Sequence, residues 1–243
     1  MSGRVRQGET VRLDGFATGV LGYPVYELAS AEEWPLLRER ALEEPLMAYA
    51  FVAVSDKEKL AWLLEHGWQL VDTNVQMEKT TSHLYQNQPA GVMFRLACQQ
   101  DEDQVAGIAR SSFICSRWHR DSKINNELAD RIKEEWARNY WRGRRGQYMV
   151  VAEVAGCVVG FNQLIKRDEG VLAIDLIAVD EKYRGKGIAG GMISFAVANC
   201  GPMTKLVVGT QLSNIASLKM YQRSGFCVVG ASHIFHCHLG GEV

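Results

Sequence analysis

Residues 171–189 read VLAIDLIAVDEKYRGKGIA and decide the fold of this chain. The first nine are an apolar run typical of a buried strand, residues 184–189 are rich in glycine, and the apolar segment that continues to about Asn199 is typical of a helix. A glycine-rich turn between a strand and a helix suits a phosphate, because small residues let backbone N–H groups approach the anion and the helix N-terminus adds positive potential. The stretch therefore predicts a phosphate-binding loop.

The glycine spacing distinguishes this loop from two common phosphate loops. Gly185, Gly187, Gly190 and Gly191 fit neither the Walker pattern G-x-x-x-x-G-K-[ST] nor the dinucleotide pattern G-x-G-x-x-G. Residues 184–189 do fit R-x-x-G-x-A, and after an apolar strand this pattern resembles the acetyl-CoA pyrophosphate loop of the GNAT superfamily of acyl-CoA N-acyltransferases. The alternative for so short a pattern is a glycine-rich helix entry that binds no ligand.

A second motif lies downstream, where residues 214–226 fit N-x-x-[AS]-x-x-x-Y-x-x-x-G-F. Spacings of three and four place Asn214, Ser217 and Tyr221 on one helix face, with Asn214 suited to the N-cap and Gly225 to the C-terminal stop. The resemblance implies that the asparagine and the small residue contact the pantetheine side of the cofactor and that Tyr221 points at the thioester sulfur. An asparagine cap beside a half-buried tyrosine is the alternative for an isolated segment, and two motifs in the right order weigh against it.

The resemblance implies an α/β (α+β) fold, the GNAT fold, in which helices flank a mixed, mostly antiparallel central sheet. We expect this domain over residues 91–243, with the order strand, helices, three strands, loop and helix, strand, helix, strand. Residues 1–90 predict a smaller N-terminal α/β domain, because strand-like runs alternate there with segments that begin at helix-capping residues. Residues 79–91, polar with proline and glycine, predict the linker.

The N-terminal part also predicts a degenerate repeat of the cofactor-binding half. Asp56, Leu63 and Trp68 have the spacing of Asn214, Tyr221 and Phe226, and a predicted strand precedes and follows each segment. Leucine replaces the tyrosine, and no R-x-x-G-x-A loop lies nearby, so we expect this part to wall one side of the acceptor cleft without binding cofactor. Chance similarity of two short helices is the alternative.

Composition narrows the class of protein. The 243 residues are 47% hydrophobic and 23% charged, which is ordinary for a globular protein, and a net charge of −1 gives no global field that favours nucleic acid or an anionic membrane. No run approaches the roughly 18 to 20 apolar residues of a transmembrane helix, and the first residues lack the apolar run of a signal peptide, so a cytoplasmic protein is expected. The basic run at residues 142–146 favours a solvated turn over a nucleic-acid contact.

The cysteine and histidine patterns predict no metal site. The six cysteines show no C-x-x-C spacing and are expected to be reduced. Residues 233–238 read HIFHCH, and in a strand His236 and His238 would share one face with Cys237 on the other, so we expect an edge strand with solvated histidines. GNAT proteins often pair through their last strands, which makes a homodimer through residues 227–238 an expectation.

The resemblance implies acetyl-CoA as co-substrate, held by two sets of residues. The first set is the end of the strand and its loop, namely Ile177, Ala178, Val179, Arg184, Gly185, Lys186, Gly187, Ile188 and Ala189, and the second is Asn214 and Ser217. The donor-rich segment 111–121 follows the first helix of the predicted domain, where GNAT folds cover the acceptor site; solvated helix ends are the alternative. The expected acceptor-binding residues are Arg117, Trp118, His119, Arg120 and Gln211.

Within the superfamily, the N-terminal extension and the segments at residues 116–119 and 210–217 are similar to acetyltransferases that act on a TDP-linked 4-amino-4,6-dideoxy sugar in surface-polysaccharide biosynthesis. The resemblance implies direct attack of a neutral amine on the thioester, with Tyr221 protonating the departing thiolate. Three candidates could take the proton from the acceptor amine: His119, Asp175 and a chain of water molecules, of which the water chain is preferred. Another small amine, such as an amino acid or a polyamine, is the alternative acceptor, and a non-catalytic acyl-CoA-binding module is the third hypothesis.

Overall fold

The structure, a computed structural model, describes residues 11–81 and 89–241, so residues 82–88 of the expected linker and the first ten residues lie outside the described part. Its strands form a ten-stranded sheet in the order β1-β2-β3-β10-β4-β9-β8-β7-β6-β5. The strands are β1 (Arg12–Leu13), β2 (Val25–Glu27), β3 (Leu46–Ala53), β4 (Gln69–Thr80), β5 (Met93–Leu96), β6 (Tyr148–Val154), β7 (Cys157–Asp168), β8 (Val171–Val179), β9 (Lys205–Gln211) and β10 (Cys227–Leu239). The α-helices are α1 (Gly15–Leu21), α2 (Trp34–Arg40), α3 (Lys57–Glu65), α4 (Glu102–Ser112), α5 (Arg117–Arg120), α6 (Asn126–Arg138), α7 (Ile188–Asn199) and α8 (Ile215–Arg223).

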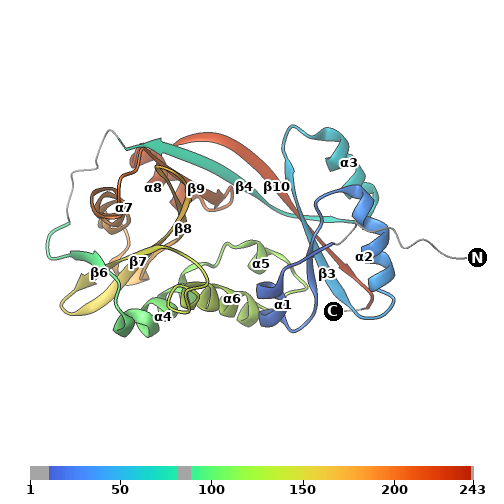
Figure 1. Cartoon of the computed structure of the whole chain (residues 1–243), viewed down its shortest axis with the longest axis horizontal. Coiled ribbons are helices and arrows are strands. Elements are labelled where there is room, and N and C mark those ends of the chain that lie inside the picture. Colours follow the sequence, from blue (N-terminus) through green and yellow to red (C-terminus); the bar gives the residue numbers. More distant parts are fainter. Residues whose placement is uncertain (1–10, 82–88, 242–243) are drawn as a thin grey trace, which may run out of the picture.

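Helices cover both faces of the sheet (Figure 1). On one face, apolar side chains of α7 and α8 pack on β4, β6, β8 and β9 in one core, which contains Met192 and Tyr221. On the other face, α4 and α6 pack on β6, β7 and β8 in a second core, around Phe161. This arrangement confirms the predicted fold class, a mixed sheet flanked by helices.

A β-bulge in β8 shapes the middle of the sheet. In its antiparallel pairing with β7, Gln163 lies opposite Leu176 and Leu164 opposite Ile174, so Asp175 is an extra residue. The parallel pairing of β8 with β9 ends at the same place, because its last pair is Ile174 with Val208. Bulges bend a strand and increase its twist. Beyond the bulge, β8 therefore diverges from β9, and its backbone edge toward β9 has no strand partner.

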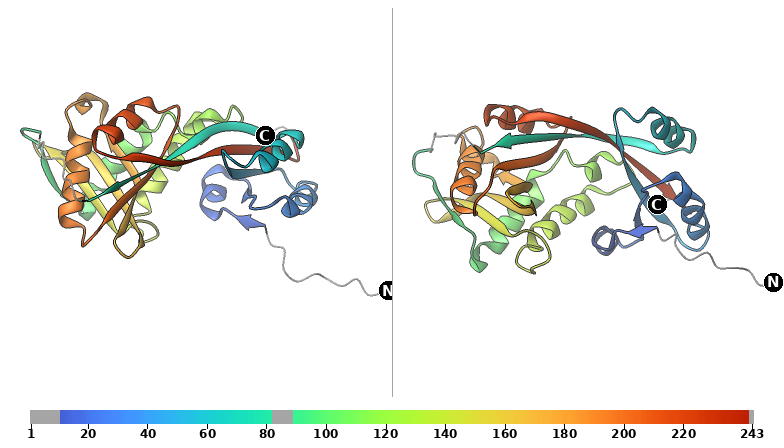
Figure 2. Two further views of the ribbon diagram at one scale, coloured as in Figure 1. Left: turned by 90° about the horizontal axis from the view of Figure 1, so that it is seen from above. Right: turned by 45° about the horizontal axis from the view of Figure 1, so that its top comes forward.

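The N-terminal part completes the sheet. Strand β4 lies between β9 and β10, antiparallel to both, and β10 pairs on its other side with β3. Figures 1 and 2 show β4 and β10 crossing together from the α8 end of the molecule to the α3 end. Strands from before and after residue 90, where a domain boundary was predicted, therefore belong to one continuous sheet.

This pairing overturns one expectation from the sequence. Residues 232–238 do not form an edge strand, because they pair with β3 on one side and largely with β4 on the other, and His236 is only 1% exposed; residues 227–230 pair with β4 alone. Pairing of a second copy along residues 232–238 would therefore have to displace β3. His236 and His238 do share one face, as alternation predicts, and both contact Asp121.

The segments β3-α3-β4 and β9-α8-β10 have matching geometry. The N-cap Asp56 accepts a hydrogen bond from the backbone of Lys59, as Asn214 does from Ser217. Their pairings are related by a local twofold axis at the pair Ser232–Asn74: β3 lies beside β10 as β9 lies beside β4. Even the bulges correspond, one extra residue falling at Val229 in β10 and one at Val71 in β4.

The N-terminal part contains two capped helix starts and, before β2, elements that differ from expectation. Asp56 is the N-cap of α3, and a capping box formed by Ser30 and Glu33 precedes α2. Strand β1 and helix α1 were not predicted; α1 begins at the cap Asp14 and packs Leu21 against α6.

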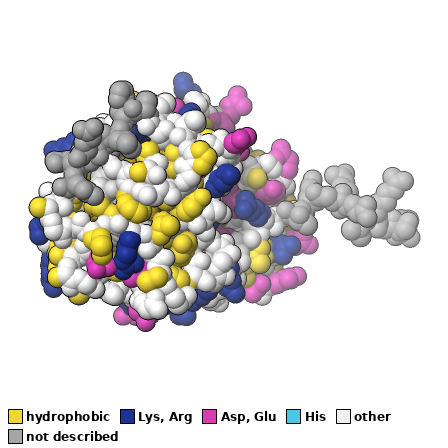
Figure 3. All heavy atoms as spheres, turned by 60° about the vertical axis from the view of Figure 1, so that its left-hand side comes forward, with side chains coloured by type: hydrophobic (Ala, Val, Ile, Leu, Met, Phe, Trp, Pro, Cys, Tyr) yellow, Lys and Arg dark blue, Asp and Glu magenta, His cyan; other side chains and the backbone are white. Residues whose placement is uncertain are grey.

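The described residues contain no helix that is long and apolar enough to cross a membrane. On the face shown in Figure 3, basic and acidic side chains are interspersed with apolar and polar ones. All six cysteines are free, with Cys200 and Cys237 buried.

Candidate active site

A cavity of about 730 Å³ opens where β8 and β9 diverge. Its wall combines the bulged part of β8, the end of β9, helix α8, the segment from Phe113 to Trp118 and helix α6. From the N-terminal part, β3 contributes Phe51 and β4 contributes Asn74, Gln76 and Met77. The cavity is therefore a joint product of both predicted domains.

The predicted phosphate loop connects β8 to α7. It contains the short 3-10 helix η3 (Glu181–Tyr183), and both Gly185 and Gly187 have a positive φ, 78° and 80°, which favours glycine. Gly187 is the N-cap of α7, and no side chain caps this end. The first-turn N–H groups of a helix have no intrahelical acceptor, so this uncapped end presents donors and partial positive charge to an anion.

Other residues fix the loop in place. The Arg184 side chain donates to the Val179 carbonyl at 2.9 Å, which ties the loop to the end of β8. Gly191 lies against Phe94 so closely that a Cβ there would be 2.3 Å from the ring, so α7 packs tightly on β5. The end of β8 and the uncapped helix end together present backbone donors that suit an anion such as a phosphate.

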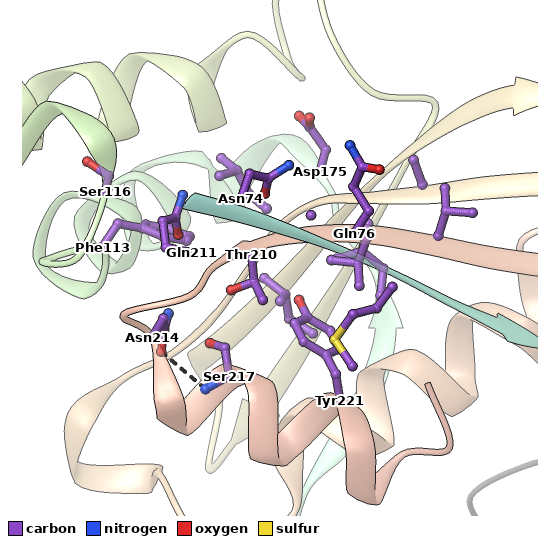
Figure 4. A pocket seen from close by; sticks show the side chains of 18 of the residues that line it. Asn74, Gln76, Phe113, Ser116, Asp175, Thr210, Gln211, Asn214, Ser217 and Tyr221 are labelled. Carbon is purple, nitrogen blue, oxygen red and sulfur yellow. Dashed lines mark hydrogen bonds between the residues drawn. The ribbon is translucent and has the colours of Figure 1, made fainter. Parts of the chain in front are cut away.

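Helix α8 directs its polar stripe toward the strands. Figure 4 shows Asn214, Ser217 and Tyr221 projecting from α8, with Asn74 and Gln76 of β4 lying across from them. The Asn214 side chain caps α8 by accepting from the Ser217 backbone at 3.1 Å, and Gly225, with a φ of 84°, follows the end of the helix, as predicted. All three residues of the stripe line the cavity, as does Ile177 of β8.

Tyr221 is 3% exposed and its ring packs edge-on against Phe226, with centroids 5.3 Å apart. Burial raises the pKa of Tyr221 well above its ordinary value near 10, because the phenolate would lose its hydration. The side chain therefore stays a neutral phenol at physiological pH. It is able to donate a proton, not to accept one.

Asp175, at the bulge, is held by four hydrogen bonds. Arg145 donates to both carboxylate oxygens at 2.6 and 2.7 Å, Trp136 Nε1 donates at 2.8 Å and Gln163 at 3.3 Å. Arg145 thus lies in a structural ion pair, although its basic run was predicted to be a solvated turn. Both carboxylate oxygens of Asp175 are therefore engaged by donors from the surrounding elements.

Of the residues expected to bind the acceptor, the structure brings Arg117, Trp118 and Gln211 to the cavity wall, but not His119 and Arg120. Both ring nitrogens of His119 have partners: Nδ1 is 2.6 Å from Ser116 Oγ and Nε2 is 2.9 Å from Asp130. Arg120 instead donates to the Val71 carbonyl in β4 at 2.9 Å. In so short a helix, neighbouring side chains point in different directions, which the clustering in sequence does not reveal.

Sequence reasoning missed Lys133, which lines the cavity from α6 and is 8% exposed. Its spacing held a signal, since Ala129, Lys133 and Ala137 are four residues apart and all buried on one face of α6. A lysine inside an apolar helical stripe marks a buried charge. Asn74 and Gln76 were also missed, and their strand gave no comparable signal.

The comparisons with known proteins agree with this geometry. The model of the acetyltransferase (GNAT) family matches residues 112–226. The chain is 32% identical over 146 residues to the spore coat polysaccharide biosynthesis protein SpsD of Bacillus subtilis, covering 58% of this chain and 49% of that protein. It is 30% identical over 117 residues to the N-acetylaspartate synthetase of Xenopus tropicalis, covering 46% of this chain and 40% of that protein.

Among solved structures, a tandem GNAT protein from the clavulanic acid biosynthesis pathway is similar, with a TM-score of 0.63 and 11% identity over 90% of this chain and 76% of that one. This likeness concerns the fold alone. The chain spans about half the length of the curated relatives that it matches.

Proposed function

Because the chain carries a domain of the acetyltransferase (GNAT) family at residues 112–226, whose members use acetyl-CoA as co-substrate, we propose that this protein is an N-acetyltransferase that acetylates the amino group of a nucleotide-linked 4-amino-4,6-dideoxy sugar. The observation that carries the proposal is the buried phenol of Tyr221 at the place where β8 and β9 diverge, within a cavity lined by both predicted domains. A module that only binds acyl-CoA would not need a proton donor at this position.

The residues present fit acetyl-CoA, which would supply the reactive acetyl thioester when bound. Residues 184–189 and the uncapped end of α7 would hold its phosphates, and Asn214, Ser217 and the free edge of β8 would hold its pantetheine. A backbone N–H near Ile177 would polarise the acyl carbonyl, as oxyanion donors do. These assignments follow from an unpaired strand edge and a helix end without a side-chain cap.

The chain's own chemistry would be positioning and proton donation. Holding two reactants in the right orientation can contribute roughly 7 to 11 kcal/mol in the best intramolecular models. Tyr221 would donate its proton to the departing thiolate; burial keeps the phenol protonated until that charge develops, although its raised pKa makes it a weaker acid than free tyrosine. The acceptor ammonium would lose its proton through water in the cavity, because neither His119 nor Asp175 offers a free basic atom there.

The acceptor class rests on likeness to SpsD, a polysaccharide biosynthesis protein, and on the resemblance of the motifs. An amino acid is the second candidate, since N-acetylaspartate synthetase is also similar. A polyamine is disfavoured, because the cavity wall already contains the buried cations Arg117 and Lys133.

Thiol release from acetyl-CoA tests the proposal, with TDP-4-amino-4,6-dideoxyhexoses, amino acids and polyamines as acceptors. We expect turnover of the sugar nucleotide and a fall in kcat of about 10²- to 10⁴-fold in Tyr221→Phe, the range for loss of a general acid. Acetyl-CoA affinity should not change, because the ring remains. Turnover of small amines alone would discard the sugar, and binding of acetyl-CoA without turnover of any amine would contradict the enzyme.

A homodimer stays a prediction, and along β10 only residues 227–230 lack a strand partner on the β3 side. The mass in solution tests it, and a monomer at micromolar concentration would count against it.

A further inference from the structure

Two cationic side chains line the acceptor end of the cavity without a counterion. Lys133 is 8% exposed, and its Nζ lies 4.6 Å from the ring centre of Trp136 and 5.1 Å from that of Phe113. Within the described residues, neither an ion pair nor a hydrogen bond engages this ammonium group. Burying an unpaired charge is costly, and aromatic faces offset only part of that cost.

The second cation is Arg117. Its guanidinium carbon lies 3.9 Å from the ring centre of Tyr49 and 4.1 Å from that of Trp118, so the group is stacked between aromatic rings. Nη1 is buried and has no hydrogen-bond partner. Stacking uses the faces of a guanidinium and leaves its edge, which is the part that binds carboxylate or phosphate oxygens in pairs.

The nearby carboxylates are engaged elsewhere. Asp175 is paired with Arg145, Asp14 accepts from Tyr49 and from the Ala17 backbone, and Asp121 accepts from His236 and His238. Asp175 acts on Lys133, and Asp14 and Glu27 act on Arg117, only at a distance, without an ion pair among the described residues.

The electrostatics of Lys133 fit this isolation. Burial lowers the pKa of Lys133 to about 8; Asp175 acts in the opposite direction, and the neighbouring cations Arg117 and Arg145 lower it further. An anion bound beside Lys133 would restore the lost stabilisation of its charged form. The unsatisfied Nη1 of Arg117 would gain its missing acceptor in the same step.

We infer that Arg117 and Lys133 form the binding site for an anionic group of the acceptor, a phosphate or a carboxylate, which orients the amine toward the divergence of β8 and β9. The inference rests on the proposed function only in taking the occupant to be the acceptor. The diphosphate of a sugar nucleotide and the carboxylate of an amino acid supply the same oxygen chemistry. Arg117 and Lys133 are thus specificity-determining residues that disfavour amines without an anionic group.

Calorimetric titration of the full chain with matched probes tests the site. TDP is compared with thymidine, and L-aspartate with L-aspartic acid diamide. We expect the anionic member of one pair to bind at least tenfold more tightly than its neutral partner, and that pair identifies the source of the anion. Lys133→Met and Arg117→Met should each reduce the preference to within twofold, whereas Lys133→Arg should retain most of it. Lys219→Met makes the same chemical change on the exposed face of α8 and should leave it unchanged.

Kinetics then separate this role from others. For an acceptor amine that the wild-type enzyme acetylates, Lys133→Met should raise the KM of the anionic acceptor at least tenfold. The kcat for that acceptor should stay within threefold of the wild-type value. A loss of kcat shared by charged and neutral acceptors would make Lys133 a base and overturn the inference. Equal binding of charged and neutral probes by the wild type would also overturn it. If TDP or aspartate binds in a way that depends on Lys133 but no amine is acetylated, the proposed function is contradicted and the anion-binding site is still supported.

Discussion

At the scale of single residues, the chemistry of the site is set by which polar atoms are already occupied. His119 and Asp175 have the right residue types for a base, yet their polar atoms are already hydrogen-bonded, those of His119 to Ser116 and Asp130 and those of Asp175 to Arg145. Within the part of the chain that the structure describes, the Tyr221 and Lys133 side chains are buried at the cavity and form no hydrogen bond. Tyr221 and Lys133 therefore differ from His119 and Asp175 in having polar atoms that are free to bind a substrate.

Replacing His119 tests the water route for the acceptor's proton. In His119→Ala, the dependence of kcat/KM on pH should match that of the wild type, because the imidazole ring does not line the cavity. Initial rates from pH 6 to 9.5 check this. If the rise of kcat/KM with pH that the wild type shows were absent from His119→Ala, His119 would be the base.

Asp121 and His236 predict a dependence of stability on pH. Burial alone would raise the pKa of Asp121, but hydrogen bonds from His236 and His238 hold it well below its usual range. Burial lowers the pKa of His236 to about 4, so the ring is neutral at pH 7 and donates Nδ1–H to the carboxylate at 2.7 Å. Below the ordinary histidine pKa, the unfolded chain binds a proton that the folded chain does not.

The free energy of unfolding should therefore fall as the pH falls from about 6.5 to about 4, by about 3 kcal/mol at 1.36 kcal/mol per unit of pKa difference. The contribution of the ionised Asp121 is lost only at lower pH, as its depressed pKa is passed. Urea titrations at stepped pH measure this. His236→Gln, which cannot take up the proton, should flatten the dependence; an equally steep slope in that variant would assign it to other groups.

At the scale of elements, the site depends on a bulge and on one close helix contact. The extra residue Asp175 ends the β8–β9 pairing, and the tight approach of Gly191 to Phe94 holds α7 against β5. The loop at Gly187 can face the end of β8 only while α7 keeps this position. In the proposed function, packing of α7 and binding of the cofactor phosphates are therefore coupled.

Gly191→Ala should destabilise the protein by about 1 to 3 kcal/mol, the usual cost of overpacking, because its Cβ would lie 2.3 Å from the Phe94 ring. The KM for acetyl-CoA should rise with it. Gly107→Ala is the matched control: it lies exposed within α4 with nothing within 4 Å of the new Cβ, and it should stabilise by about 0.5 to 1 kcal/mol. Thermal unfolding of both variants decides; similar shifts of the same sign would refute the packing argument.

At the scale of the whole molecule, the N-terminal part is built into the sheet. Strand β4 separates β9 from β10, and β3 covers the other side of β10. Without residues 11–81, one side of β9 and both sides of β10 would lose their partners, and exposed strand edges invite aggregation. The two predicted domains therefore share one sheet and one cavity.

A fragment of residues 91–243 should not show a cooperative unfolding transition, and it should aggregate at concentrations where the whole chain is monodisperse. Co-expression with residues 1–90 should restore solubility and acetyl-CoA binding, because β4 would again pair with both strands. Calorimetry and light scattering provide the readout. A fragment that unfolds cooperatively and binds acetyl-CoA alone would make residues 91–243 an independent domain.

Local chemistry determined what the sequence could predict. The order of elements in residues 91–243, the Asn214 cap, the Gly225 stop and the polar face of α8 depend on spacing and on near neighbours, and each is found as expected. The spacing of Asp56 and Trp68 likewise pointed to the geometry that α3 shares with α8.

The tertiary structure alone decided what depends on distant partners. Strand β10 reads like an edge, and only pairing with β3 and β4 makes it central. The direction of each side chain in α5 depends on what packs around it, so Arg117 faces the cavity while His119 does not. Lys133 and Asn74 reach the site because α6 and β4 meet there. A contact between residues far apart in the chain produces no periodic sequence pattern from which it could be predicted.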